Sequence, residues 1–146
     1  MRIRPFNIND RKAVVQLWYD CGLVTATNNP SKDILRKLKV QPHLFLVAIQ
    51  KDKVVGTVMG GYEGHRGWIS YLAVDPVQQK SGIGRKLMNK VEKQLKKLGC
   101  PKINLQVRES NSEVRAFYER IGYSQDKVFS YGKRLIKDPR PSKKSP

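Results

Sequence analysis

The stretch Tyr71–Leu87, YLAVDPVQQKSGIGRKL, determines the fold that this sequence predicts. It opens with an apolar segment typical of a β-strand, and this segment ends at Asp75-Pro76. A short polar loop leads into Gly82-Ile83-Gly84, where an amphipathic helix begins. Glycines at the start of a helix let backbone N–H groups come close to a ligand, and the helix dipole favours negative charge there. The stretch therefore predicts a binding site for a phosphorylated cofactor.

Three kinds of phosphate-binding loop compete for this glycine motif. A dinucleotide fingerprint needs a third glycine three residues after the second, and Leu87 stands at that position. A nucleoside-triphosphate loop ends in Lys-Ser or Lys-Thr, which this loop lacks. The third pattern is Q/R-x-x-G-x-G/A, and Gln79-Lys80-Ser81-Gly82-Ile83-Gly84 matches it. The third kind of loop is therefore the one that the residues favour.

Around this stretch, hydrophobic periodicity and turn residues predict an alternation of helices and strands. Strands are expected at 2–5, 44–49, 54–59, 68–74 and 102–107, with a last apolar segment at 128–136; helices are expected at 10–21, from 31 onward, from 84 to about 98 and at 112–121. Strands joined by short turns should pair antiparallel, while the helix after Gly84 can cross over to a parallel neighbour. The order predicts a mixed central sheet with helices on both faces.

Length and composition predict one globular domain, residues 1–136, followed by a basic tail, 137–146, that we expect to be disordered. No apolar run approaches the roughly 20 residues that span a bilayer. Cys21 and Cys100 are too few for a disulfide framework or a zinc site, so we expect no metal. The N-terminus lacks the apolar core of a signal peptide, and the sequence is interpreted as a cytoplasmic protein without a membrane partner.

The charge is unusually positive, with a formal net value of +17. Residues 84–97 hold six lysines and arginines against Glu92, and residues 133–146 hold six against Asp138. Such charge favours anionic partners, including phosphorylated cofactors and nucleic acids. Nucleic-acid recognition usually adds aromatic or base-reading side chains among the charges, and neither segment has them. A nucleic-acid partner is therefore not expected.

A second motif supports the choice of loop. Asn111-Ser-Glu-Val-Arg-Ala-Phe-Tyr-Glu-Arg-Ile-Gly-Tyr123 resembles the N-x-x-A-x-x-F-Y-x-x-x-G-F/Y segment of the GNAT N-acetyltransferases, with Val114 in place of the small residue. The loop at Gln79–Gly84 and the preceding Leu72-Ala73-Val74-Asp75-Pro76 resemble the same family. The resemblance covers roughly residues 1–136 and is closest to a small bacterial subgroup whose substrate we cannot name. It implies the α/β GNAT fold, with a mostly antiparallel sheet of six to seven strands and about four helices.

The resemblance also implies how acetyl-CoA binds as co-substrate. Backbone N–H groups of residues 79–84 would hold the pyrophosphate, with a side-chain donor at Gln79 or Ser81. Lys80 and Arg85 would approach the phosphates. Leu72, Ala73 and Val74 would lie along the pantetheine arm, and a backbone N–H near Leu72 would polarise the thioester carbonyl. The implied cofactor-binding residues are thus Leu72, Ala73, Val74, Gln79, Lys80, Ser81, Gly82, Ile83, Gly84, Arg85, Asn111 and Tyr118.

Acetyl transfer to an amine needs an acid for the departing thiolate and a route by which the amine loses its proton. By resemblance, Tyr118 is the general acid and Asn111 contacts the pantetheine or the loop. No carboxylate lies in the strand at 68–74, so Glu63 is the expected base. His65, Glu109 and ordered water are the alternatives. Neither cysteine lies in a motif that would activate it, so we expect direct attack in a ternary complex.

The predicted function is transfer of an acetyl group from acetyl-CoA to a primary amine, on a small molecule or a protein. One alternative is a protein N-terminal or lysine acetyltransferase of the ribosomal-protein type, to which Leu105-Gln-Val-Arg-Glu-Ser-Asn111 bears a more distant similarity. Another is a non-catalytic module that binds acyl-CoA or nucleic acid. Relatives often form homodimers, so a homodimer is a further expectation, without a specified interface.

Overall fold

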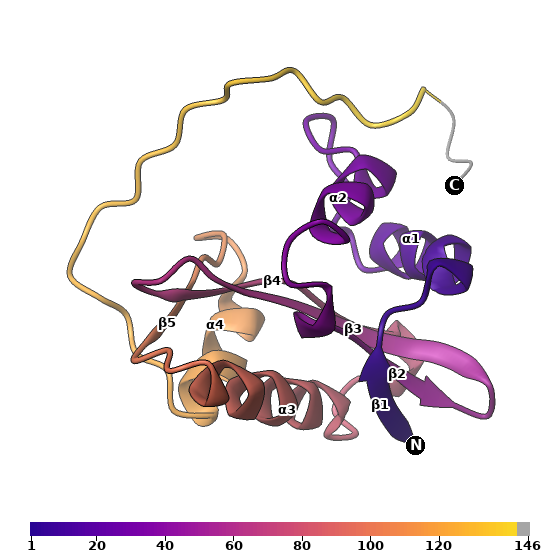
Figure 1. Ribbon diagram of the computed structural model, residues 1–146, viewed down its shortest axis with the longest axis horizontal. Coiled ribbons are helices and arrows are strands. Elements are labelled where there is room, and N and C mark those ends of the chain that lie inside the picture. Colours follow the sequence, from indigo (N-terminus) through magenta and orange to yellow (C-terminus); the bar gives the residue numbers. More distant parts are fainter. Residues whose placement is uncertain (143–146) are drawn as a thin grey trace.

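The computed structural model describes residues 1–142, in which one twisted sheet lies between two layers of helices (Figure 1). Five strands form the sheet in the order β1-β2-β3-β4-β5. Their bounds are β1 (Arg2–Pro5), β2 (Phe45–Gln50), β3 (Lys53–Tyr62), β4 (Gly67–Val74) and β5 (Ile103–Leu105). Neighbouring strands are antiparallel as far as β4, and β4 pairs with β5 in parallel. The prediction of a mixed, mostly antiparallel sheet is confirmed.

Four α-helices cover the two faces of this sheet, as the sequence predicted. Helices α1 (Arg11–Asp20) and α2 (Pro30–Lys37) cover one face, and α3 (Ile83–Lys97) and α4 (Ser112–Arg120) cover the other (Figure 1). Short 3-10 helices lie at Ile8–Asp10, Pro42–Leu44 and Pro76–Gln78. The last of these connects β4 to the loop that opens α3.

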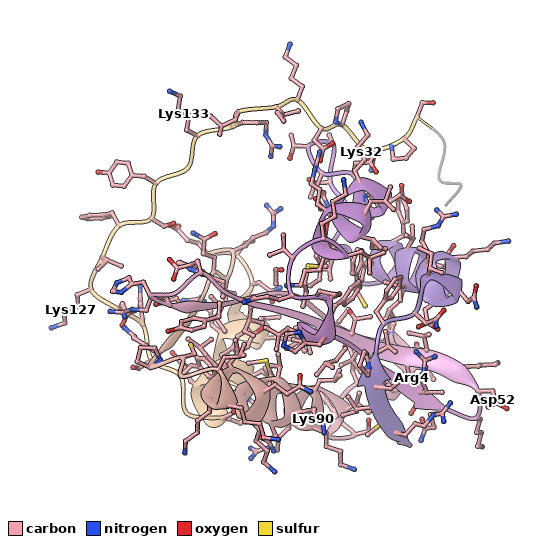
Figure 2. All side chains as sticks on the ribbon, in the orientation of Figure 1. Arg4, Lys32, Asp52, Lys90, Lys127 and Lys133 are labelled. Atoms are coloured by element: carbon pink, nitrogen blue, oxygen red, sulfur yellow. The ribbon has the colours of Figure 1, made fainter. Side chains whose placement is uncertain are left out.

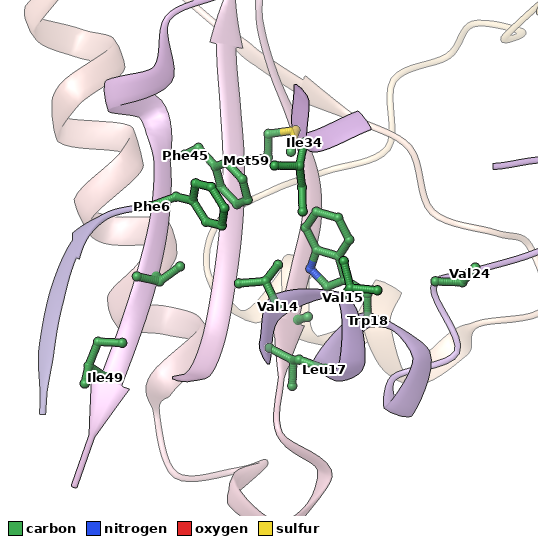
Figure 3. Packing of buried hydrophobic residues seen from close by; sticks show 12 residues of the cluster. Phe6, Val14, Val15, Leu17, Trp18, Val24, Ile34, Phe45, Ile49 and Met59 are labelled. Carbon is green, nitrogen blue, oxygen red and sulfur yellow. The ribbon is translucent and has the colours of Figure 1, made fainter. Parts of the chain in front are cut away.

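Each face of the sheet has its own hydrophobic core. On the first face, Trp18 of α1 packs against Phe45 of β2, with ring centroids 6.0 Å apart, and Phe45 stacks on Phe6 at 4.5 Å (Figure 3). On the second face, the buried stripe of α3 contains Leu87, Val91 and Leu95. Full burial of one such side chain contributes about 1.5–3 kcal/mol. These two cores hold β4 and the start of α3 in a fixed relation.

Two glycines of β3 let α3 lie unusually close to the sheet. A Cβ at Gly60 would stand 2.7 Å from Val91 Cγ2, and one at Gly56 would stand 2.9 Å from Leu87 Cδ1. Real Cβ atoms do not approach other atoms so closely, because the electron shells overlap. The absence of side chains at these two positions therefore sets the distance between α3 and the sheet.

The prediction of six to seven strands is wrong, because the sheet of the described chain has five. The apolar segment at 128–136, which we expected to form strand, has no regular secondary structure. It belongs to a stretch that we call the C-terminal arm, residues 124–137, which leaves the body after α4 and returns toward α2 (Figure 1). A strand needs a neighbour for its backbone hydrogen bonds, and within residues 1–142 the arm has none.

The predicted tail, 137–146, lies partly outside the described residues, since residues 143–146 are not among them. In its described part, Asp138 is buried and accepts a hydrogen bond from Arg36 Nη1 at 2.7 Å. Asn29 Nδ2 donates to the carbonyl of Pro139 at 3.2 Å. None of the helices in the described residues combines the length and the apolar character needed to cross a bilayer.

Candidate functional site

The glycine loop and the first turn of α3 form the part of the site that the sequence singled out. Gly82 caps α3 with φ at 88°, in the left-handed region, and Lys80 also has a positive φ of 67°. A Cβ added at Gly82 would meet no atom within 4 Å, so open space lies beside the loop at this point. A Cβ at Gly84 would lie 3.3 Å from the Phe117 ring, which shows how closely α4 packs against the start of α3.

The backbone N–H groups of this loop are available to a ligand. Within residues 1–142, no acceptor takes a hydrogen bond from the N–H of any residue from 79 to 85. The first helical bond of α3 runs from the Lys86 N–H to the Gly82 carbonyl, at 3.1 Å. Unpaired donors at the N-terminus of a 15-residue helix, together with its dipole, favour an anion. The loop therefore has the donors that a phosphate group requires.

The loop side chains divide into those that brace the loop and those that face solvent. Gln79 Nε2 donates to the Val74 carbonyl at 3.1 Å, and the Ser81 hydroxyl donates to the Gln78 carbonyl. Of these two predicted phosphate donors, Gln79 thus ties the loop to the end of β4, and Ser81 ties it to the 3-10 helix at Pro76–Gln78. Lys80 and Arg85 are exposed and add positive charge beside the open N–H groups.

Strands β4 and β5 separate next to this loop. Within residues 1–142 they pair from Gly67↔Ile103 to Ile69↔Leu105, so the remainder of β4, residues 70–74, has no partner strand on that side in the described part of the chain. On the other side of β4 the register with β3 shifts between Thr57↔Ala73 and Met59↔Ser70, which places Tyr71 and Leu72 opposite one residue of β3. Such a bulge bends a strand and redirects its backbone groups. Leu72 and Val74 pack on the α3 side and Ala73 on the α1 side.

The bulge is held by a closed set of contacts around Tyr71. This residue has φ at 50°, which is strained for a side chain of its size. Trp18 stacks on the Tyr71 ring with centroids 3.7 Å apart, and its Nε1 donates to Thr57 Oγ1 at 2.9 Å. The Thr57 hydroxyl in turn donates to the Tyr71 carbonyl at 2.8 Å. Several independent contacts thus maintain the strained backbone.

The Tyr71 hydroxyl ties β4 to the segment between α1 and α2. It donates to Asp33 Oδ2 at 2.6 Å and accepts from Asn28 Nδ2 at 2.7 Å. Burial, followed by the neighbouring Asp33 carboxylate, raises the pKa of Tyr71 far above that of a free phenol. Tyr71 therefore remains a neutral hydrogen-bond donor at physiological pH.

Tyr118 lies in α4, in the same packed cluster as Leu72 and Val74. Its side chain is buried, with ring contacts to Phe117 and Tyr123, and no hydrogen bond of its hydroxyl is found within residues 1–142. Burial raises the pKa of Tyr118 to about 12. The phenol is thus protonated at neutral pH and able to donate. Asn111 caps α4 by accepting from the Val114 N–H at 3.2 Å.

The candidate bases lie away from this cluster. Glu63 is exposed in the turn between β3 and β4, where its carboxylate accepts from the N–H groups of Arg66 and His65. These two backbone hydrogen bonds lower the pKa of Glu63. His65 lies in the same exposed turn, and Glu109 is exposed in the loop after β5. The structure brings Tyr118 near β4 and the loop, but it does not bring Glu63 there.

Sequence reasoning missed two members of the site. Asp33 is a carboxylate beside the bulge, although in the sequence it is an ordinary acidic residue in the first turn of a helix. Thr57, fully buried, stands out in the sequence only as a member of a strand. Trp18 and Tyr71, which stack on each other in the structure, are 53 residues apart in the sequence, and no local pattern connects them.

Comparison with known proteins agrees with this geometry. The model of the acetyltransferase (GNAT) family matches residues 11–123, which is more than half of the chain. The matched segment contains α1, the bulged strand, the glycine loop and α4.

Solved structures of several acetyltransferases have the same fold. Ard1 from Thermoplasma volcanium has a TM-score of 0.76 and 25% identity, covering 84% of this chain and 82% of its own. The ribosomal-protein-S18-alanine N-acetyltransferase from Escherichia coli has a TM-score of 0.72 and 22% identity, and the match covers 86% of this chain and 78% of that protein's chain. Aminoglycoside 6'-N-acetyltransferase AAC(6')-IG from Acinetobacter haemolyticus has a TM-score of 0.71 and 16% identity, and the match covers 93% of this chain and 100% of that protein's chain. On the family match and the shared fold, this chain belongs to the GNAT acetyltransferase family.

Proposed function

We propose that this protein transfers an acetyl group from acetyl-CoA to a primary amine by direct attack in a ternary complex. The observation that carries the proposal is the row of open backbone N–H groups at the start of α3, next to the opening between β4 and β5. Coenzyme A bears a pyrophosphate and a 3′-phosphate on one end and a thioester on the other. A phosphate loop beside a parted pair of strands offers a place for each end.

The proposed roles follow the geometry of the chain's own groups. Residues 79–85 bind phosphate, with Lys80 and Arg85 adding positive charge. The unpaired side of β4 at Leu72–Val74 would offer backbone groups to the pantetheine, apart from the Val74 carbonyl, which accepts from Gln79 Nε2. A backbone N–H of the bulge near Leu72 would donate to the thioester oxygen. Asn111 supports this arrangement as the cap of α4, from which Tyr118 projects.

In the proposed reaction Tyr118 protonates the departing thiolate. The thiol of a model compound has a pKa near 8.5, and a phenol with a pKa of about 12 is protonated throughout the working range. The acceptor amine must lose its own proton, either to Glu63, as the sequence predicted, or to ordered water. Glu63 has a lowered pKa, which makes it a weak proton acceptor at neutral pH, and this favours the water route.

The charge on and beside α2, where we propose that the acceptor amine approaches, bears on the class of amine. Asp33 and Asp138 both lie beside Arg36, at 3.4 and 2.7 Å, and Lys32 is 3.9 Å from Asp138. A hollow of about 670 Å³ next to these groups is lined by Arg36, Asp138 and residues 132–136 of the arm. The carboxylates are therefore already neutralised. This disfavours strongly cationic acceptors such as polyamines and favours a monoamine or a protein amine.

The proposal is tested by a screen of amine acceptors in which the release of free thiol from acetyl-CoA is measured. We expect Tyr118→Phe to lower kcat by about 10²-fold or more while the Kd for acetyl-CoA stays nearly constant, because the hydroxyl acts only in the transition state. Glu63→Gln serves as the matched variant: an unchanged pH–rate profile supports the water route. Undiminished turnover by Tyr118→Phe would remove the acid assignment, and no turnover with any amine would favour the alternative of a non-catalytic acyl-CoA module.

A further inference from the structure

The exposed face of α3 carries a row of lysines, which we call the α3 lysine row. Its members recur every three or four residues and so lie one above the other along the helix: Lys86, Lys90, Lys93 and Lys97. All four are exposed, and the row is about 16 Å long at the rise of an α-helix. Lys90 lies on the side of α3 that faces away from the sheet (Figure 2). The opposite side of α3 is buried, so this row is the surface that the helix presents to solvent.

No carboxylate within residues 1–142 neutralises this row. The ion pairs of the described chain include Lys32 with Asp138 at 3.9 Å and Lys102 with Asp126 at 2.9 Å, but none of them involves a lysine of α3. Glu92 is the one acidic residue of the helix, and its carboxylate accepts a hydrogen bond from the Tyr123 hydroxyl at 2.5 Å, on the α4 side. The α3 lysine row is therefore a strip of uncompensated positive charge.

This strip destabilises the helix that carries it. Like charges three or four residues apart on a helix repel each other. Lys97 lies in the last turn, where the negative end of the helix dipole compensates, but Lys90 and Lys93 lie outside that turn. Lysines that alternate with glutamates would give the same helical propensity and solubility without the repulsion. A row of like charges that the helix itself does not need indicates an anionic partner.

We propose that the α3 lysine row binds the phosphate backbone of duplex DNA without reading its sequence. A duplex bears one negative charge per about 1.7 Å of its axis, so a row of about 16 Å faces about nine phosphate charges. Contacts between lysine amines and phosphate oxygens hold a protein on a duplex without specifying bases. The expectation of no nucleic-acid partner rested on the lack of aromatic and base-reading side chains. That lack excludes base recognition, but a backbone contact needs neither kind of side chain.

Other anionic surfaces fit the row less well. A membrane-bound helix inserts its apolar face, and the apolar face of α3, with Leu87, Val91 and Leu95, is buried against the sheet. Specific protein interfaces are poor in lysine and rich in aromatic residues, and the row has no aromatic member. Single strands and RNA are held by stacking on aromatic rings or by contacts to 2′-hydroxyls and base edges. The regular phosphates of a DNA duplex require only the charges that the row provides.

The row extends away from the glycine loop. Lys90 lies about 12 Å along the helix axis from Gly82, farther than the screening length of about 8 Å at physiological ionic strength. DNA bound at Lys90, Lys93 and Lys97 therefore leaves the loop open to acetyl-CoA. Binding of DNA does not depend on acetyl transfer, so each can be tested without the other.

Fluorescence anisotropy of a labelled short DNA duplex of mixed sequence, measured over a salt series, tests this binding. We expect saturable binding with a slope of log K against log[salt] of about −4, because each lysine that contacts a phosphate contributes about −0.9. The double variant Lys90→Gln/Lys93→Gln should reduce this slope by about 2 and weaken binding about tenfold or more at low salt. Its control, Lys12→Gln/Lys39→Gln, removes the same charge from exposed positions in α1 and after α2, and should bind as the wild type does.

Circular dichroism and titration with acetyl-CoA show whether the double variant is intact, and both should match the wild type. No saturable binding of the duplex by the folded wild type at low salt would overturn the proposal. Equal slopes for the two double variants would also overturn it, because the contact would then depend on total charge and not on α3. Tighter binding of a single strand or of an RNA duplex of the same length would contradict the choice of duplex DNA.

Discussion

At the scale of single residues, the bulge at Tyr71 is the feature with the most contacts and the least sequence signal. The stacking on Trp18 and the two hydrogen bonds of its hydroxyl join β4, which holds the positive φ, to α1, to α2 and to the segment between these helices. No local pattern encodes such a meeting, because it depends on how α1, α2, β3 and β4 pack. The glycine loop, in contrast, is contiguous, and its residues could be identified from the sequence alone.

Thr57→Val tests how much the bulge depends on these contacts. The substitution keeps the shape of the side chain but removes the hydroxyl that accepts from Trp18 and donates to the Tyr71 carbonyl. It leaves buried polar groups without partners, so we expect a loss of about 1–3 kcal/mol in the free energy of unfolding. Urea denaturation measures it. Thr27→Val, at an exposed position, should change the free energy of unfolding by less than about 0.5 kcal/mol. A change just as small for Thr57→Val would show that the Thr57 hydroxyl is dispensable.

At the scale of the elements, the sequence predicted the four α-helices and the five strands of the sheet near their observed positions, although β3 extends to Tyr62 and the three 3-10 helices were not predicted. The apolar stripe of α3 and the period-two pattern of the strands report local geometry, which is why they could be interpreted without tertiary information. The prediction failed at residues 128–136, where the pattern is that of a strand but no strand within residues 1–142 pairs with the segment. Hydrophobic periodicity shows that a segment suits a strand, but it does not show whether a neighbouring strand is available to pair with it.

In the candidate site, too, the residues of local motifs could be predicted and the residues brought together by tertiary packing could not. The end of the glycine loop packs against α4, since Ile83 lies in the same core as Tyr118 and Gly84 lies against the Phe117 ring; each motif is local, and the fold joins them. Glu63 does not lie with them, since its choice rested on nearness in sequence to β4 and the strand carries residue 63 to the far end of the hairpin. Asp33 lies beside the Tyr71 bulge because α2 packs next to β4, which no local sequence pattern shows.

At the scale of the whole molecule, acid should destabilise the protein strongly. Hydrogen bonds to cationic partners lower the pKa of Asp126 and of Asp138, the latter chiefly through Arg36. For Asp10, burial opposes the charged form, but the hydrogen bonds from Arg4 and the Asn7 backbone outweigh it and lower its pKa as well. A lowered folded pKa gives stability that is present above the unfolded pKa and is lost as pH falls through the folded value.

We therefore expect the thermal midpoint to fall between pH 5 and about pH 3. The charge of +17 at neutral pH becomes larger still as carboxylates take up protons, and added salt at low pH should restore part of the midpoint by screening this repulsion. Differential scanning calorimetry across pH, with and without salt, measures both effects. A midpoint that is independent of pH in this range would contradict the assigned ion pairs.

The central claim is that the loop before α3 binds the phosphates of acetyl-CoA, and calorimetric titration with acetyl-CoA tests it most directly. Gly82→Ala places a methyl group in the open space beside the loop, whereas Gly99→Ala makes the same change at the other end of α3, with the same φ of 88° and equally open surroundings. Each variant should lose about 1 kcal/mol of stability, because alanine is strained in this conformation. We predict saturable binding by the wild type and by Gly99→Ala, and binding at least tenfold weaker by Gly82→Ala. Equal binding by all three proteins, or no binding by the folded wild type, would contradict the account.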